Sequence, residues 1–198
     1  MAERILVTGG AGYLGSIMVP AMLANGFAVT VVDNLLFGQA PLLDCCADPK
    51  FDFVNGDICN YPLMQELIAK HDIIAPLAAI VGAPACKLNP TLTGLVNREA
   101  HLNIAKAVSK GQMVIFPTTN SGYGIGEKDA FCTEASPLKP ISEYGVTKVE
   151  IEKAFLDRGT AITFRLATVL GMSPRMRMDL LVNDFTWRAF KDRCITLF

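Results

Sequence analysis

Short apolar runs alternate with stretches of helical periodicity along the whole chain. The apolar runs are "RILVTGG", "FAVTVVD", "FDFVNGD", "DIIAPLAA", "QMVIFPTT" and "AITFRLATV". Between them the pattern predicts helices from about residue 13, near 63–70, from about 92 to 109 and from about 143 to 156. Uninterrupted apolar strands separated by helices predict a parallel sheet covered on both faces. The fold class is therefore α/β, a Rossmann-type doubly wound sheet.

The C-terminal residues depart from this alternation. We expect residues 1–170 to form the Rossmann domain and residues 171–198 to begin a smaller substrate-binding part. The last residues, "CITLF", have the pattern of a new strand. Since a compact domain rarely ends inside an element, this second part is either minimal or truncated.

Composition and charge exclude several classes of protein. Hydrophobic residues make up 51% of the chain and charged residues 19%, which is a globular composition. A net charge of -1 gives no reason to expect nucleic acid or an anionic membrane as a partner. The N-terminus has no long apolar region of a secretory signal. The most apolar tract, residues 73–86, is shorter than a bilayer span and contains two prolines.

The cysteines and histidines predict neither a disulfide framework nor a metal site. None of the six cysteines forms a C-x-x-C pair, and neither His71 nor His101 is spaced for zinc with them. Reduced thiols indicate a cytoplasmic protein.

The segment "VTGGAGYLGS" places four glycines between the first strand and the first helix. It fits G-x-x-G-x-x-G at Gly9, Gly12 and Gly15, and also G-x-G-x-x-G starting at Gly10. One glycine makes a tight turn, one lets a pyrophosphate approach the backbone, and one lets helix and strand pack closely. The helix N-terminus then offers free N–H groups to the phosphates. The alternative is a purely structural glycine-rich turn.

Two carboxylates follow the next two strands. Asp33 ends "VTVVD", 18 residues after Gly15, where it can accept hydrogen bonds from both hydroxyls of an adenosine ribose. Its charge would repel a 2′-phosphate, and no arginine follows within several residues, so NAD is favoured over NADP. Asp57 in "FVNGDI" is placed to bind the adenine amino group, with Ile58 against the ring. A plain loop aspartate is the alternative for Asp57.

The segment "SEYGVTK" contains Tyr144 and Lys148, an i, i+4 pair on one helix face. A phenol with a pKa near 10 is a poor base at neutral pH, and a nearby ammonium lowers that pKa. Tyr144 can then remove a proton from a sugar hydroxyl while Lys148 holds the nicotinamide ribose. Thr119, in the hydroxyl-rich end of "VIFPTTNS", would orient the reacting oxygen. The alternative is a surface lysine beside a half-buried tyrosine.

These residues together resemble the extended short-chain dehydrogenase/reductase family, the NAD-dependent sugar epimerases and dehydratases. The segments "TGGAGYLG", "DNL", "GDI", "PLAA", "TTNSGYG" and "YGVTK" follow that family's order and spacing. Tyr144 follows Thr119 by 25 residues, as the family's hydroxyl–tyrosine pair requires. The resemblance covers nearly the whole chain.

The resemblance implies a set of contacts residue by residue. Thr119, Tyr144 and Lys148 would be catalytic. The cofactor NAD would contact Gly9, Gly12, Tyr13, Leu14, Asp33, Asn34, Asp57, Ile58, Leu77, Ala78, Ala79, Thr118, Tyr144 and Lys148. The substrate would contact Val81, Asn120, Ser121, Thr168 and Asn183.

Several positions depart from the family pattern, among them Pro76, where family members often have a histidine. Family 4,6-dehydratases carry Thr-Asp-Glu where this chain has Thr119-Asn120-Ser121, and Asn and Ser cannot supply the acid and base that water elimination needs. The family's substrate-binding Asn after the "FR" strand is Thr168 here. A dehydratase is therefore disfavoured.

The segments "IIAPLAAIVGAPAC", "ISEYGVTK" and "FRLATVLGMSPRMRMDLLVNDF" resemble most closely the NAD-dependent GDP-D-glycero-α-D-manno-heptose 4-dehydrogenases of bacterial capsule synthesis. That resemblance implies oxidation at C4″, a GDP-linked sugar, 2-oxoglutarate as a hydride acceptor, and a homodimer through helices near 92–109 and 143–157. Two alternatives are kept: a 4-epimerase of the same family, and a non-catalytic NAD-binding fragment.

Overall fold

The computed structural model describes residues 2–126 and 131–197. Within these residues six parallel strands form one sheet in the order β3-β2-β1-β4-β5-β6. The strands are β1 (Arg4–Thr8), β2 (Ala28–Asp33), β3 (Phe51–Asn55), β4 (Ile73–Pro76), β5 (Met113–Thr119) and β6 (Ala161–Leu166). Each of the predicted apolar runs contains one of them, so the Rossmann-type α/β fold is confirmed.

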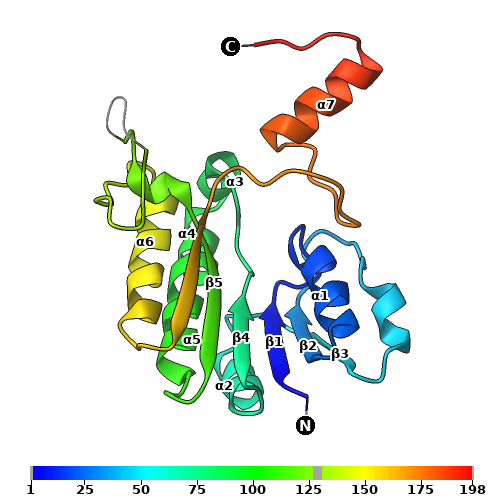
Figure 1. Ribbon diagram of the computed structural model, residues 1–198, viewed down its shortest axis with the longest axis vertical. Helices are drawn as coiled ribbons and strands as arrows, with labels where there is room; N and C mark the ends of the chain where they lie inside the picture. The colour runs from blue at the N-terminus through cyan, green and yellow to red at the C-terminus, as the bar shows by residue number, and fades with distance from the viewer. Residues whose placement is uncertain (1, 127–130, 198) are drawn as a thin grey trace.

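Helices connect the strands and cover the sheet (Figure 1). They are α1 (Gly15–Ala24), α2 (Tyr61–Ala69), α3 (Ala83–Leu88), α4 (Pro90–Thr93), the π-helix η2 (Gly94–Ala100), α5 (His101–Ala107), α6 (Glu143–Leu156) and α7 (Leu181–Lys191). Two short 3-10 helices are η1 (Leu43–Ala47) and η3 (Asn120–Tyr123). Proline at the start of α2 and a serine cap at α6 fix where these two helices begin, because both residues suit a helix N-terminus.

The helix predicted over residues 92–109 consists of three consecutive parts, α4, η2 and α5. A π-helix, η2, lies between α4 and α5. Asn97 in η2 turns its amide to the loop after β4, where it accepts from Ile80 N and donates to Ile80 O, both at 2.8 Å. π-Helical turns are frequent at functional sites. This one ties the helix to the loop that follows a central strand.

Two apolar clusters lie on the two faces of the sheet. On one face, side chains of α2, α5 and α6 pack with Leu6, Ile74 and Phe116, all fully buried. On the other face, α1 and η1 pack with Val7 and Val31. The alternation of side chains along each strand puts both faces in contact with helices, which is why these strands are apolar without interruption.

The β5–β6 edge differs from the expectation of cover on both faces. Met113, Ile162 and Phe164 point away from α6 and remain 42%, 47% and 48% exposed. The opposite side chains of β6, Thr163 and Arg165, bond to Glu152 of α6. On the face of the sheet opposite α6, helices therefore pack mainly over β1, β2 and β3.

Residues 171–191 leave the sheet at the carboxyl ends of its strands. Figure 1 shows the segment after β6 crossing above these ends and leading into α7, which stands apart from the sheet. Within α7 the buried residue is Asn183. Residues 194–197 form no strand, so the expectation of a new strand at the end is wrong. In the described ranges, no helix has the length and apolar character needed to cross a bilayer.

Candidate active site

The turn between β1 and α1 is too tightly packed for side chains at two of its glycines. Gly9 has a φ of +68°, and a Cβ there would lie 2.5 Å from the Cα of Ala78 after β4. A Cβ on Gly15 would lie 2.4 Å from the carbonyl oxygen of Gly10. Gly12 N donates to Gly9 O at 3.0 Å and closes the turn. Glycine at these two positions therefore lets the turn pack closely against the loop after β4 and against the start of α1, as in turns that bind a diphosphate at a helix N-terminus.

Asp33 ends β2 with both carboxylate oxygens bound to backbone amides. Oδ2 accepts from Ala11 N at 3.0 Å and Oδ1 accepts from Leu35 N at 2.8 Å. Each oxygen keeps a further lone pair for another donor. Leu35 has a φ of 52°, which is uncommon for a residue with a side chain and is typical of ligand-binding loops. Asp33 can therefore accept two ribose hydroxyls without giving up its own structural bonds.

Asp57 lies beside the loop that carries Asp33. Its Oδ2 accepts from Asn34 Nδ2 at 3.0 Å, and its Oδ1 accepts from Cys59 N at 2.8 Å. Burial raises the pKa of Asp57, but the hydrogen bonds from Cys59 and Asn34 together bring it below its usual value. Ile58 is buried. Asp57 is therefore ionised at neutral pH, and the bond from Asn34 places it next to the loop that carries Asp33.

The loop after β4 is held against the glycine-rich turn. Leu77 N donates to Thr8 O at 3.0 Å, and Ala78 N donates to Thr8 Oγ1 at 3.2 Å. Ala78 is the residue that lies against Gly9. Ala79 comes next, followed by Ile80, whose backbone is bonded to Asn97. The predicted contacts at 77–79 therefore lie at the same edge of the sheet as the glycine-rich turn.

The end of β5 carries the hydroxyl-rich segment that contains Thr119. Thr119 Oγ1 accepts from Ser121 N at 3.1 Å and donates to Ser121 Oγ at 3.2 Å. Asn120 and Ser121 are exposed, whereas Thr118 is buried and its Oγ1 has no hydrogen-bond partner in the described structure. A buried hydroxyl without a partner is unusual and indicates a group that a ligand can satisfy.

The N-terminus of α6 packs against this end of β5. Ser142 Oγ accepts from Gly145 N at 3.1 Å and caps the helix. A Cβ on Gly145 would lie 3.2 Å from Ser121 O, so the backbone beside Tyr144 lies against η3. The segments carrying Thr119 and Tyr144 are therefore packed together on the same side of the molecule.

Lys148 lies one helical turn after Tyr144 and is almost completely buried. Its Nζ is 5.9 Å from the centroid of the Tyr144 ring and 4.8 Å from the centroid of the Phe116 ring. Burial lowers the pKa of Lys148 to about 8, against a smaller opposing effect of Cys86. The ammonium is thus still charged at neutral pH and rests on an aromatic face.

The pKa of Tyr144 differs from the sequence-based expectation. Burial raises this pKa, Cys86 raises it further, and the charge that lowers it comes from Arg177 rather than from Lys148. Arg177 lies in the segment after β6, whose position was not predictable from the helix motif. The phenol therefore needs its surroundings, and not only the neighbouring lysine, to act as a base.

The segment after β6 is bonded directly to the glycine-rich turn. Tyr13 donates its hydroxyl to Gly171 O at 2.7 Å and accepts from Asn183 Nδ2 at 3.1 Å. Asn183 Oδ1 accepts from Gly171 N at 3.0 Å, and its Nδ2 also donates to Arg177 O at 2.9 Å. Asn183, predicted to contact substrate, thus uses its amide to bind the chain to the turn.

The remaining predicted site residues make fewer contacts with the segments described above. Leu14 directly precedes α1, Val81 is 41% exposed after β4, and Thr168 is exposed after β6. Sequence reasoning missed Asn97, Arg177 and Ser173. A polar residue inside an apolar helical pattern was a usable signal for Asn97, whereas nothing local pointed to the other two.

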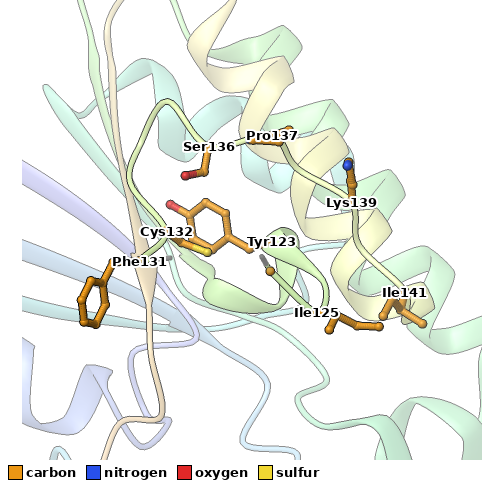
Figure 2. A pocket seen from close by; sticks show the side chains of 9 residues that line it. Tyr123, Ile125, Phe131, Cys132, Ser136, Pro137, Lys139 and Ile141 are labelled. Carbon is orange, nitrogen blue, oxygen red and sulfur yellow. The ribbon is translucent and has the colours of Figure 1, made fainter. Parts of the chain in front are cut away.

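A separate cavity of about 310 Å³ lies in the loop between η3 and α6. Figure 2 shows the Tyr123 ring among the lining side chains, with Phe131 pointing away from it. Arg165 Nη1 donates to Tyr123 OH at 3.1 Å and links this loop to β6. None of the predicted site residues lines the cavity.

No group of His, Cys, Asp and Glu in the described ranges could hold a metal ion.

The family model described as "NAD dependent epimerase/dehydratase family" matches residues 5–187. The chain belongs to this NAD-dependent epimerase/dehydratase family. Within the family, it is 35% identical over 98% of its length to a dTDP-glucose 4,6-dehydratase of an Actinoplanes species, of which it covers 61%. It is 31% identical over 89% of its length to UDP-glucose 4-epimerase 3 of Oryza sativa, of which it covers 47%.

Solved structures of the family have the same fold. UDP-glucuronic acid 4-epimerase from Bacillus cereus, in complex with UDP-glucuronic acid and NAD, superposes with a TM-score of 0.83 at 26% identity. The match covers 98% of this chain and 65% of that chain. The present chain thus spans about half to three fifths of the length of the curated family members it matches.

His101 is buried near Lys148, and this burial makes the stability of the protein depend on pH. It is fully buried, and its Nδ1 carries the proton because it lies 2.9 Å from the Val96 carbonyl, which can only accept. Burial, followed by the charge of Lys148, lowers the pKa of His101 from 6.5 to about 3. The unfolded chain therefore binds a proton between these pH values that the folded chain does not, so acidification below 6.5 favours unfolding.

We expect His101→Gln to remove this acid sensitivity. Between about pH 7 and about pH 4.5, the wild type should lose on the order of 3 kcal/mol of unfolding free energy through His101 alone. The variant is less stable at neutral pH, because it loses packing against Phe116, but the difference from wild type should shrink on acidification. Urea denaturation at several pH values measures both curves. A difference independent of pH would contradict a neutral buried imidazole.

Proposed function

We propose that this chain forms the cofactor-binding and catalytic part of an NAD-dependent enzyme that oxidises a nucleotide sugar at C4″. One observation carries the proposal: Tyr144 and Lys148 start a helix that packs against the hydroxyl-rich end of β5. That end lies at the carboxyl edge of a parallel sheet, where doubly wound folds bind ligands. Membership in the NAD-dependent epimerase/dehydratase family supports the same assignment.

The residues present fit NAD. The first turn has glycine at the two positions where its backbone packs against Ala78 and Gly10, as a dinucleotide-binding turn requires, and Asp33 keeps free lone pairs for ribose hydroxyls. A relative solved with bound NAD has the same fold over 98% of this chain. When bound, NAD supplies the acceptor for a hydride leaving the sugar carbon.

The chain's own side chains would handle the sugar hydroxyl. Tyr144 takes the hydroxyl proton as general base, and Thr119 orients the same oxygen through its hydroxyl. Lys148 Nζ has no hydrogen-bond partner among the described residues, and its charge at neutral pH suits it to hold ribose hydroxyls. Arg177 assists Tyr144 because its charge lowers the pKa of the phenol.

Two outcomes share this first step. In a 4-epimerase the keto sugar is reduced again on its other face, and the names of the relatives, UDP-glucose and UDP-glucuronic acid 4-epimerases, favour this outcome with a UDP-sugar. In a 4-dehydrogenase the keto sugar is released. Sequence resemblance favours GDP-D-glycero-α-D-manno-heptose as that substrate, 2-oxoglutarate as the hydride acceptor, and a role in capsule synthesis.

A 4,6-dehydratase fits the site less well, despite the name of one relative. Elimination of water needs an acid and a base beside Thr119, and Asn120 and Ser121 provide neither. The predicted homodimer through 92–109 and 143–157 also stays a proposal. It is supported by the exposed apolar side chains of Leu95, Val146 and Leu156 on these helices.

One experiment separates the outcomes. The protein is purified, its bound dinucleotide is identified by mass spectrometry, and UDP-glucose, UDP-glucuronic acid and the GDP-heptose are added with and without 2-oxoglutarate. The sugar is followed by NMR and NADH by absorbance. An epimerase gives a stereoisomer without lasting NADH, whereas a dehydrogenase gives keto sugar with NADH or 2-hydroxyglutarate. Bound NAD with no change in any sugar would support the non-catalytic alternative and overturn the proposal.

A further inference from the structure

Arg175, in the segment after β6, lies against a loop from the opposite half of the sheet. Its Cζ is 3.8 Å from the centroid of the Phe37 ring, in the loop that follows Asp33. Figure 1 shows the segment after β6 running across the carboxyl ends of the strands toward the α1 side. The fold thus brings an arginine next to the predicted adenosine end of the cofactor site.

The chain holds Arg175 in this position through the glycine-rich turn. Ser173 Oγ accepts from Arg175 N at 3.2 Å and donates to Tyr13 O at 2.9 Å. The hydroxyls of Ser173 and Ser16 lie 2.8 Å apart, which joins the segment to α1 as well. Two hydroxyls and the turn backbone therefore fix the base of the Arg175 side chain.

Asp33 helps to fix the loop that carries Phe37, the other partner in this contact. Its Oδ1 accepts from Leu35 N, and Leu35 takes the left-handed conformation that redirects the chain toward Phe37. The Phe37 side chain is 62% exposed, so Arg175 covers one face of a ring that would otherwise be open to water. An aromatic ring and a guanidinium then lie together immediately after the carboxylate.

The guanidinium of Arg175 has donors that the protein does not use. It makes no side-chain hydrogen bond or ion pair within residues 2–126 and 131–197, and its Nε is buried without a partner. Most other arginines bind carboxylates: Arg4, Arg98, Arg165, Arg177 and Arg188. A guanidinium carries five N–H donors, and a partly buried one with none satisfied is suited to a ligand.

The charge of Asp33 reaches Arg175 without an ion pair between them. Burial and the charge of Arg177 lower the pKa of Arg175, and the charges of Asp179 and, to a smaller extent, Asp33 oppose this lowering. Asp33 is occupied by the amides of Ala11 and Leu35 instead. Asp33, which repels anions, and Arg175, which attracts them, therefore both act on the predicted adenosine end of the cofactor site.

We propose that Arg175 is a cofactor-contacting residue that sets dinucleotide specificity together with Asp33. In this arrangement Asp33 binds the adenosine ribose hydroxyls and repels a 2′-phosphate, while Arg175 covers the same ribose from the side of Phe37. NADP is then rejected because the repulsion of its 2′-phosphate by Asp33 is stronger than the attraction of that phosphate by Arg175. No arginine follows Asp33 within several residues of the sequence, but the fold brings Arg175 to the loop that follows Asp33. This inference rests on the proposed binding of NAD.

A double-mutant cycle tests the pairing. Asp33→Asn, Arg175→Met and the double variant are stripped of bound dinucleotide, and their affinities for NAD and NADP are measured by calorimetry. We expect Asp33→Asn alone to bind NADP roughly tenfold or more tightly than wild type, because a guanidinium–phosphate pair becomes available. In the Arg175→Met background, the same substitution should improve NADP binding by less than about threefold.

Three controls keep the test decisive. Arg188→Met removes an exposed arginine of α7 and should change neither affinity. Thermal unfolding shows whether each variant is folded. Should Arg175→Met fail to fold, Arg175→Lys keeps one charge but not the stacked plane, and should retain only part of the gain in NADP affinity.

The outcomes separate this inference from the proposed function, since dinucleotide binding requires no sugar turnover. An equal gain in NADP affinity with and without Arg175 overturns the role of Arg175. Failure of the wild type to bind either dinucleotide overturns both. The expected cycle with no change in any sugar supports Arg175 and overturns only the catalytic assignment.

Discussion

Replacing Tyr144 with phenylalanine is expected to reduce sugar oxidation by about three orders of magnitude, within the range that general acid–base groups contribute. Phenylalanine keeps the ring and its packing but removes the oxygen that takes the proton. The ring lies 5.9 Å from Lys148 Nζ, and this spacing does not depend on the hydroxyl. NAD should therefore remain bound to the variant.

The measurement combines turnover, followed by NMR of the sugar, with calorimetric titration of NAD. Tyr61→Phe is a matched control, because Tyr61 starts α2 and its hydroxyl bonds only to the exposed side chain of Gln65 in the described structure. Turnover in Tyr144→Phe that equals the control would rule out Tyr144 as the base. Loss of NAD together with turnover would instead make Tyr144 a cofactor-binding group.

Replacing Gly9 with alanine is expected to abolish dinucleotide binding and to destabilise the fold. The new Cβ would lie 2.5 Å from the Cα and 2.6 Å from the backbone nitrogen of Ala78. These are backbone atoms of the loop after β4, which cannot yield as a flexible side chain can. The positive φ adds a conformational penalty for any L side chain. Together the two effects should cost about 3 kcal/mol of unfolding free energy.

Gly94→Ala provides the control for this substitution. Gly94 starts η2, and in the described structure no atom outside its chain neighbours and its own helix backbone lies within 4 Å of the position of its Cβ. Alanine there should leave stability unchanged or raise it by up to about 1 kcal/mol, because alanine favours helical backbone. Chemical denaturation gives both free energies and calorimetry gives both NAD affinities. Similar stability and affinity in the two variants would mean that Gly9 is not held against Ala78.

Local pattern was sufficient for most elements of the fold. The central runs became strands because a strand buried on both faces must be apolar on both faces, and that requirement is visible within a few residues. The helix predicted over about 143–156 was confirmed as α6, where a serine cap marks the start. The helix predicted over about 92–109 was found as the consecutive α4, η2 and α5, but its π-helical middle was not predicted, nor were the bonds of Asn97 to Ile80, which join residues on different elements.

The sequence by itself determined the sheet, the glycine-rich turn, the position of Asp33, and the helical spacing of Tyr144 and Lys148. These features depend on conformations and periodicities set by neighbouring residues. Only the tertiary structure decided that Arg177 acts on Tyr144, that Asn183 binds Tyr13, and that Arg175 lies beside Phe37. Charge and burial act through space, so contacts between residues tens of positions apart or more leave no local pattern in the sequence.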